Sequence, residues 1–141
     1  MKIRAYKPAD EIGIVDLWHQ CDLVRPWNDP HLDIRRKLDV QPELFLVAEQ
    51  GSSIVGTVMC GYEGHRGWVN YLAVSPALQG NGLGRRLMRA AESALEVRGC
   101  PKLNIQVRST NEAVLAFYNK LGYTVDPVVS LGKRLIQDTQ Q

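Results

Sequence analysis

The chain has few of the features that mark disulfide-stabilised or membrane-spanning proteins. Its three cysteines, Cys21, Cys60 and Cys100, are odd in number and form no C-x-x-C pair. This pattern argues against a disulfide scaffold or a structural zinc site and is typical of reduced thiols. The longest apolar run, residues 44–48, is far too short for a bilayer, and no apolar segment follows the basic start. We therefore expect a cytoplasmic protein with no membrane partner and no bound metal.

A large excess of charge of either sign is also missing. The 17 Lys and Arg residues nearly balance the 15 Asp and Glu residues, which leaves a formal net charge of +2. This balance argues against a nucleic-acid-binding protein, whose basic surface would need more cations. Apolar residues make up 45% of the 141 residues, an ordinary globular share that suffices for one core. No linker or repeat divides the chain, so we expect a single domain over residues 1–141.

Hydrophobic periodicity and turn residues predict alternating strands and helices. In chain order these are a strand at 3–6, a helix after Asp10, a helix from Pro30 to about Val40, a hairpin of strands 44–49 and 54–62, a strand at 68–74, a helix at 83–98, a strand at 103–107, a helix at 111–121, and strands at 123–125 and 128–131. The first helix is expected to bury Ile12, Val15, Trp18 and Cys21. This order predicts an α/β (α+β) fold with a mixed sheet, in which residues 68–107 form a parallel crossover.

The most informative segment joins the expected strand 68–74 to the helix that follows it. It contains Gln79-Gly80-Asn81-Gly82-Leu83-Gly84-Arg85-Arg86. A glycine inside a helix costs about 1 kcal/mol relative to alanine, and cations at a helix N-terminus oppose the helix dipole. Both features become favourable if an anion binds, because free N–H groups and guanidinium groups can contact phosphates. The alternative interpretation is a tight glycine turn with solvated arginines.

The spacing of these glycines excludes two common phosphate-binding loops. A dinucleotide-binding fingerprint requires glycine at position 85 or 87, where this chain has Arg85 and Leu87. A Walker A loop requires Gly-Lys followed by Ser or Thr, and no such tripeptide occurs. The pattern that fits is Q-x-x-G-x-G, which begins at Gln79.

This pattern resembles the acyl-CoA pyrophosphate loop of the GCN5-related N-acetyltransferase (GNAT) family, and the resemblance extends over the whole chain. The family's second cofactor motif, N-x-x-A-x-x-F-Y-x-x-L-G-Y/F, is similar to the segment from Asn111 to Tyr123. Segments 21–30, 61–67 and 131–136 look like those of the bacterial YpeA subgroup. The resemblance implies a GNAT-like fold, with a six- to seven-stranded mixed sheet and about four helices, and acetyl-CoA as co-substrate.

The resemblance also implies roles for individual residues. Strand residues ending at Val74 would pair with the pantetheine arm, and a bulge near Ala73–Val74 would leave an N–H free for the thioester carbonyl. Tyr118 matches the family tyrosine that protonates the departing thiolate, although core packing alone would also explain it. The cofactor-binding residues implied in this way are Leu72, Ala73, Val74, Gln79, Gly80, Asn81, Gly82, Leu83, Gly84, Arg85, Asn111, Phe117 and Tyr118.

The general base is less clearly indicated. Some relatives place a glutamate where this chain has Gln106, whose amide cannot accept a proton. The remaining candidates are Glu63 and His65, because a histidine with an ordinary pKa near 6.5 can accept a proton at neutral pH. An ordered water oriented by Asn70 and Tyr71 is the alternative.

The acceptor amine is expected to bind between the first two helices, as in the family. The candidate acceptor-binding residues are Arg25, Trp27, Asn28, Asp29 and Tyr71. Trp27 offers an apolar wall, Arg25 a partner for an acceptor carboxylate, and Asp29 or Glu63 a partner for a cationic amine. The competing interpretation is a helix corner in which Trp27 fills the core and Asn28 and Asp29 cap the next helix.

The sequence therefore predicts an N-acetyltransferase that moves an acetyl group from acetyl-CoA directly to an amine. No cysteine lies in either motif, so a covalent acetyl-enzyme has no evident nucleophile, with Cys60 and Cys100 left open. The first alternative is a non-catalytic acyl-CoA-binding or sensing module, and the second is a phosphate loop for another nucleotide. Expected partners are acetyl-CoA and an amine acceptor, with no nucleic acid and with a homodimer as an option.

Overall fold

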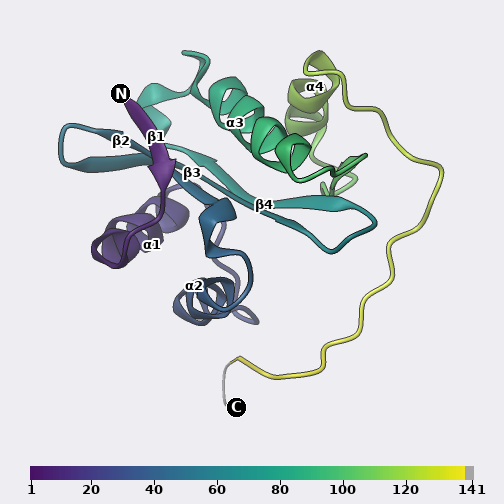
Figure 1. Cartoon of the computed structure of the whole chain (residues 1–141), viewed down its shortest axis with the longest axis horizontal. Helices are drawn as coiled ribbons and strands as arrows, with labels where there is room; N and C mark the ends of the chain where they lie inside the picture. The colour runs from purple at the N-terminus through teal and green to yellow at the C-terminus, as the bar shows by residue number, and fades with distance from the viewer. Residues whose placement is uncertain (139–141) are drawn as a thin grey trace.

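The computed structural model describes residues 1–138, which form a five-stranded sheet with helices on both faces (Figure 1). The strands are β1 (Lys2–Ala5), β2 (Phe45–Gln50), β3 (Ser53–Tyr62), β4 (Gly67–Val74) and β5 (Leu103–Ile105). The α-helices are α1 (Glu11–Gln20), α2 (Pro30–Leu38), α3 (Leu83–Val97) and α4 (Glu112–Lys120), and the short 3₁₀ turns are η1 (Pro8–Asp10), η2 (Pro42–Leu44) and η3 (Pro76–Leu78). This arrangement confirms the expected α/β class.

The strands follow chain order across the sheet, and only the last pair is parallel. β1 to β4 are joined in antiparallel pairs, whereas α3 returns the chain so that β5 runs parallel to β4. The parallel pairing covers only Gly67–Val69 against Leu103–Ile105. Beyond Val69 the two strands separate, which opens the sheet between residues 70–74 and the segment after β5.

Two hydrophobic clusters, one on each face, hold the sheet between its helices. The first joins α3 and α4 to the sheet through buried residues such as Leu87, Met88 and Tyr118. The second joins α1 and α2 through residues such as Trp18 and Ile34, both fully buried. Because the central strand β3 contributes to both clusters, the helices on the two faces pack against opposite sides of the same strand.

Helix ends lie close to the predicted positions because the capping chemistry is local. Asp29 precedes Pro30 and accepts hydrogen bonds from the backbone N–H groups of His31 and Leu32, as an N-cap does. Gly82 and Gly99 flank α3 with φ of +83° and +81°, a left-handed conformation that favours glycine. The parallel crossover through α3 is confirmed.

The expected apolar face of α1 is partly wrong. Ile12 is 75% exposed, whereas Ile14, Val15, Leu17 and Trp18 are buried. A series spaced strictly three residues apart moves around a helix by about 60° per step, since three residues turn only 300°. The buried stripe therefore follows mixed spacings of three and four residues, and Ile12 falls outside it.

The expected strands at 123–125 and 128–131 are absent from the sheet, so the described residues form five strands rather than six or seven. Pro127 lies between these segments and lacks the N–H that a strand ladder needs. Side chains instead hold the segment beside β5: Lys102 and Asn104 both donate to Asp126 at 3.0 Å. The segment then leaves the sheet and approaches α2 (Figure 1).

The carboxylate of Asp138 holds the segment after α4 near α2. Asp138 accepts hydrogen bonds from the Asp29 backbone N–H at 2.9 Å and from Arg36 at 2.8 Å. Arg36 and this N–H lower the pKa of Asp138 to about 2.

Within residues 1–138 no helix has both the length and the apolar character needed to cross a membrane.

Candidate active site

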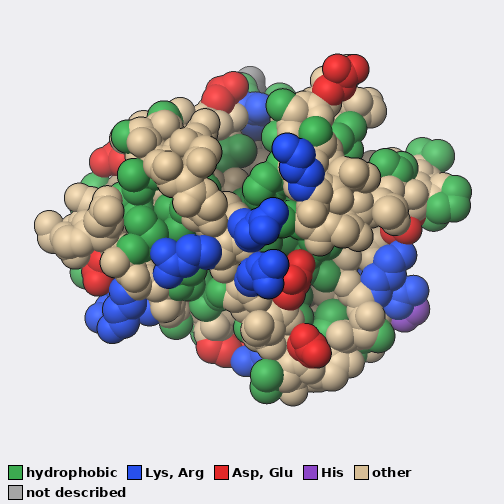
Figure 2. Space-filling view, turned by 90° about the horizontal axis from the view of Figure 1, so that it is seen from above, with side chains coloured by type: hydrophobic (Ala, Val, Ile, Leu, Met, Phe, Trp, Pro, Cys, Tyr) green, Lys and Arg blue, Asp and Glu red, His purple; other side chains and the backbone are tan. Residues whose placement is uncertain are grey.

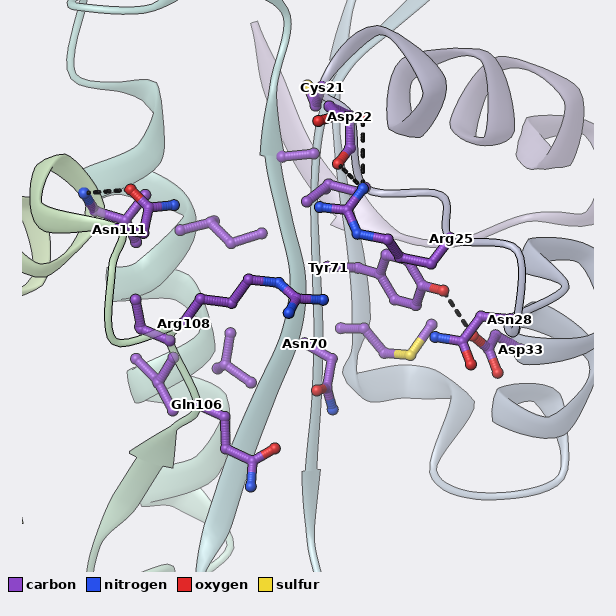
Figure 3. A pocket seen from close by; sticks show the side chains of 18 of the residues that line it. Cys21, Asp22, Arg25, Asn28, Asp33, Asn70, Tyr71, Gln106, Arg108 and Asn111 are labelled. Carbon is purple, nitrogen blue, oxygen red and sulfur yellow. Dashed lines mark hydrogen bonds and ion pairs between the residues drawn. The ribbon is translucent and has the colours of Figure 1, made fainter. Parts of the chain in front are cut away.

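A cavity of about 940 Å³ lies where β4 and β5 separate. Its walls come from the loop after α1, one face of α2, residues 69–74 of β4, the segment after β5 and the start of α4. Figure 3 shows Arg25 and Tyr71 on one side of this space and Arg108 and Asn111 on the other. The volume lies in the range of small-molecule and cofactor sites.

A β-bulge in β4 forms the floor of the cavity. Thr57 pairs with Ala73 and Met59 pairs with Asn70, so Tyr71 and Leu72 together oppose the single residue Val58. Tyr71 has a φ of +52°, a left-handed conformation that is unfavourable for a bulky side chain. The bulge thus begins two residues earlier than the expected position near Ala73–Val74.

Two direct hydrogen bonds, and a third that fixes one of the partners, hold Tyr71 in this conformation. The buried Thr57 hydroxyl donates to the Tyr71 carbonyl at 2.8 Å and accepts from the Trp18 indole N–H at 2.9 Å. The Tyr71 hydroxyl donates to Asp33 Oδ2 at 2.6 Å. Burial, reinforced by the neighbouring Asp33, raises the pKa of Tyr71, so the phenol stays neutral. A strained backbone position supported in this way is typical of a functional site.

The glycine loop, residues 80–85, leaves its backbone accessible at the start of α3. Gly80 and Gly82 have φ of +86° and +83°, and a Cβ built on either would meet no atom within 4 Å. The first hydrogen bond of the helix joins the Arg86 N–H to the Gly82 carbonyl, so the N–H groups of residues 83–85 have no helical acceptor. This arrangement can accept an anion at the positive end of the helix dipole.

The absence of a side chain at Gly84 serves the packing of α4 against α3. A Cβ at this position would lie 3.1 Å from the Phe117 ring. The glycine therefore lets α4 approach α3 closely, which brings the two motifs together in space.

Arg85 and Arg86 are exposed in the first turn of α3. Figure 2 shows Lys and Arg side chains gathered on the surface seen from above, the side on which α3 lies.

Tyr118 reaches the cavity from α4. Its side chain is buried, its ring meets Phe117 and Tyr123 edge-on at 5.1 and 5.7 Å, and it lines the cavity. Burial raises its pKa to about 12, so the phenol keeps its proton at neutral pH. Within residues 1–138 its hydroxyl makes no hydrogen bond, which leaves it free to donate to a ligand.

The cavity brings together ten of the site residues predicted from the sequence. These are Arg25, Trp27, Asn28, Tyr71, Leu72, Ala73, Val74, Gln79, Asn111 and Tyr118. Trp27 is 53% exposed at the rim, so it does not fill the core. Asn111 also caps α4, since its side chain accepts from the Val114 N–H. Outside the lining lie Gly80, Asn81, Gly82, Leu83, Gly84, Arg85 and Phe117, which belong to the glycine loop and its support, and Asp29, Glu63 and His65.

Asp29 and Glu63 have structural partners, and Glu63 and His65 lie away from the cavity. Asp29 caps α2, as the competing interpretation held. Glu63 and His65 lie in the turn between β3 and β4, at the opposite end of β4 from the glycine loop. The Glu63 carboxylate accepts from the backbone N–H groups of Arg66 and His65, and these bonds lower its pKa. A lowered pKa makes Glu63 a weaker base.

The structure adds lining residues that the motifs did not indicate. Asp33 on α2 and Arg108 after β5 both line the cavity. Arg108 could have been found by the rule that ligands bind beyond the carboxyl ends of parallel strands. Cys21 also lines the cavity, but its thiol donates to the Val74 carbonyl and burial raises its pKa. A neutral thiol is a poor nucleophile, and the described residues include no cluster of His, Cys, Asp and Glu suited to a metal.

Comparisons with known proteins agree with this geometry. The sequence profile of the Acetyltransferase (GNAT) family matches residues 13–123. An acetyltransferase of Yersinia enterocolitica is 51% identical over 140 residues, and one of Pectobacterium atrosepticum is 49% identical over 140 residues, with 99% of each chain covered in both cases. The fold is similar to that of glucosamine-6-phosphate N-acetyltransferase from Arabidopsis thaliana, with a TM-score of 0.70 at 21% identity over 96% of this chain and 98% of that one.

These matches cover the elements that build the cavity and the glycine loop, and they confirm the family that the two motifs suggested. The family profile alone spans more than half of the chain. The chain belongs to the GNAT family of acetyltransferases.

Proposed function

We propose that this chain transfers an acetyl group from acetyl-CoA directly to a primary amine. The observation that carries the proposal is that the cavity runs from the strained bulge at Tyr71 along β4 to Gln79, the residue that precedes the glycine loop. Leu72, Ala73, Val74 and Gln79 line this part of the cavity. The cavity therefore offers a reaction site at one end and adjoins an anion site at the other.

The glycine loop would hold the diphosphate of acetyl-CoA. The N–H groups of residues 83–85 supply donors, and the open space around Gly80 and Gly82 lets phosphate oxygens approach the backbone. Arg85 adds a charge-assisted contact from the exposed first turn. The pantetheine arm would then run along β4 through the gap that opens beyond Val69.

The bulge would hold the thioester. A bulge removes backbone groups from the strand ladder, so an N–H at Tyr71 or Leu72 would be available to the carbonyl oxygen. The amine nitrogen forms a bond to the carbonyl carbon, the carbon–sulfur bond breaks, and the sulfur takes a proton from the Tyr118 hydroxyl. Tyr118 is reprotonated from solvent, and the amine gives its extra proton to water.

The residues that line the cavity explain why water is the proposed base. They include no histidine and no glutamate. Of the two aspartates, Asp33 is held by Tyr71 and Arg36, and Asp22 has a side chain that is 92% exposed and pairs with Arg25. An amine that is already neutral in solution therefore reacts without a dedicated base.

A sensing module is the second candidate, because Gln106 lines the cavity at the position of the family glutamate. Thermal shift with acetyl-CoA, NAD and ATP tests the ligand, since only a molecule that binds the folded state raises the melting temperature. Release of CoA with a broad amine panel then tests catalysis. Stabilisation by acetyl-CoA with amine-dependent CoA release supports the transferase. Stabilisation without release favours the sensor, and stabilisation by NAD or ATP alone favours another nucleotide.

A further inference from the structure

The cavity at the bulge carries more positive than negative side chains. Four cationic and two acidic residues line it. Two of the cations are already held by the protein. Arg36 binds Asp33 and Asp138, and the Lys37 ammonium donates to the Cys60 carbonyl at 2.6 Å. Burial also lowers the pKa of Lys37, which weakens its tendency to stay charged.

The other two cations, Arg25 and Arg108, have unused hydrogen-bond donors. All three hydrogen bonds of Arg25 use Nη1, so its Nε and Nη2 edge has no partner among residues 1–138. The Arg108 side chain makes no hydrogen bond or ion pair within the same residues, although its backbone carbonyl accepts from the Asn111 N–H. Figure 3 shows the two side chains on opposite walls, with Arg108 directed toward Tyr71 and the Arg25 guanidinium lying beside Asp22. An arginine edge of this kind matches carboxylate or phosphate oxygens in a bidentate manner.

The acidic side chains do not cancel this charge. Asp33 Oδ2 accepts from Tyr71 and its Oδ1 lies 3.4 Å from Arg36. Asp22 meets Arg25 only through Nη1, at 3.4 Å. The space between Arg25 and Arg108 is therefore the part of the cavity with unpaired positive charge, and it lies over the bulge where the amine must react.

We infer that the acceptor is a small amine that also carries an anionic group, a carboxylate or a phosphate, bound between Arg25 and Arg108. This inference rests on the proposed function and names the substrate class of the same site. Because Arg25 and Arg108 lie on opposite walls around Tyr71, an anion bound between them would lie close to the bulge and to the reacting nitrogen. Uncharged amines and polyamines lack the group that these arginines recognise.

Arg108 is better placed for the acceptor than for the phosphates of acetyl-CoA. The loop residues 80–85 do not line this cavity, whereas Arg108 does and is directed at the bulge. Arg85 and the N–H groups at the start of α3 already supply the positive charge and the hydrogen-bond donors for the diphosphate. The two anion sites are thus separated along β4.

The test compares amines that differ only in the anion. Wild-type enzyme is assayed for CoA release with L-phenylalanine against phenethylamine, O-phosphoethanolamine against ethanolamine, and the peptide Ala-Glu-Ala against Ala-Gln-Ala, both with an amidated C-terminus. The expected result is a kcat/KM at least about tenfold higher for the anionic member of at least one pair, the size of one charge-assisted interaction. The pair with the largest ratio distinguishes an acceptor carboxylate from a phosphate.

Variants then assign the preference to the two arginines. Arg108→Ala and Arg25→Ala are expected to bring the ratio close to one while the KM for acetyl-CoA stays within about twofold, and Arg108→Lys to keep part of the ratio. Arg98→Ala is the matched control, because Arg98 pairs with Glu43 at the surface and does not line the cavity. It should leave the ratio unchanged.

The possible failures are distinct. Turnover with equal rates for both members of every pair overturns this inference and leaves the transferase in place. A retained ratio in Arg108→Ala and Arg25→Ala, or a rise in the KM for acetyl-CoA alone, overturns the assignment to the two arginines. No turnover with any amine, despite binding of acetyl-CoA, overturns the proposed function and this inference with it.

Discussion

The indole ring of Trp18 lies flat against the phenol ring of Tyr71, with ring centroids 3.7 Å apart and planes 12° apart. The same indole donates to the Thr57 hydroxyl, which in turn donates to the Tyr71 carbonyl. One buried tryptophan therefore supports both the side chain and, through Thr57, the backbone of the strained residue. The bulge is positioned by the core of the α1 face before any ligand binds.

Thr57→Val tests this support. The substitution keeps the shape of the side chain but leaves the Trp18 N–H and the Tyr71 carbonyl without their buried partner. We expect a loss of about 2–4 kcal/mol in the free energy of unfolding, measured by urea denaturation, together with a lower kcat. Thr57→Ser retains the hydroxyl and should lose only about 1 kcal/mol. Equal losses in both variants would show that the hydroxyl does not support the bulge.

Gly82→Ala tests the anion site, with Gly99→Ala as its control. Both glycines flank α3 with nearly equal φ, and a Cβ at either would meet no atom within 4 Å. Each alanine should cost about 1–2 kcal/mol in stability, since L residues disfavour this conformation. Only Gly82→Ala should raise the Kd for acetyl-CoA, by about tenfold or more, in a calorimetric titration. An equal Kd for both variants would place the diphosphate elsewhere.

Tyr118→Phe tests the proton donor. Without the hydroxyl the thiolate must leave unprotonated, so kcat should fall about 100-fold or more while the Kd for acetyl-CoA stays the same. Tyr123→Phe removes a half-buried hydroxyl that binds Glu92 outside the cavity, and it should leave kcat close to wild type. A normal rate for Tyr118→Phe would remove this residue from the mechanism.

The pH dependence follows from the raised pKa of Tyr118 and the absence of a histidine or glutamate among the residues that line the cavity. With a pKa of about 12, Tyr118 remains a proton donor throughout the range from pH 7 to 10. We expect kcat/KM to rise with pH up to the pKa of the acceptor, near 8 for an α-amine and near 10.4 for a lysine-like amine. A plateau that begins near pH 6.5 with every acceptor would instead indicate a base on the enzyme.

The same pKa sets the pH limits of that measurement. Because the folded state raises the pKa of Tyr118 above its unfolded value near 10, its contribution to stability is complete below pH 10. That contribution is lost as the pH rises from 10 toward 12. Thermal melts between pH 7 and 10 should therefore show no loss of stability from Tyr118, which provides the control for the rate profile.

Features that depend on local chemistry were predictable from the sequence. The cap formed by Asp29 and Pro30, the left-handed glycines around α3, and the crossover through α3 all follow from turn chemistry and periodicity. The two motifs identified the family because their glycine and aromatic spacings are specific. Tyr118 reaches the cavity as its motif implied.

Features that depend on contacts between distant segments were not predictable. The position of the bulge is decided by Thr57 and Trp18, which lie far from Tyr71 in the chain. Arg108 becomes a cavity residue only because β4 and β5 separate after Val69. The segment after α4 has apolar residues typical of strands, yet side-chain hydrogen bonds to β5 replace the expected ladder.

A crystal structure with acetyl-CoA bound is the most direct test of the central claim. We predict that the diphosphate accepts hydrogen bonds from the N–H groups at the start of α3, that the thioester carbonyl lies at the Tyr71–Leu72 bulge, and that the sulfur lies within reach of the Tyr118 hydroxyl. A diphosphate bound away from residues 80–85, or a thioester outside the gap between β4 and β5, would contradict the account.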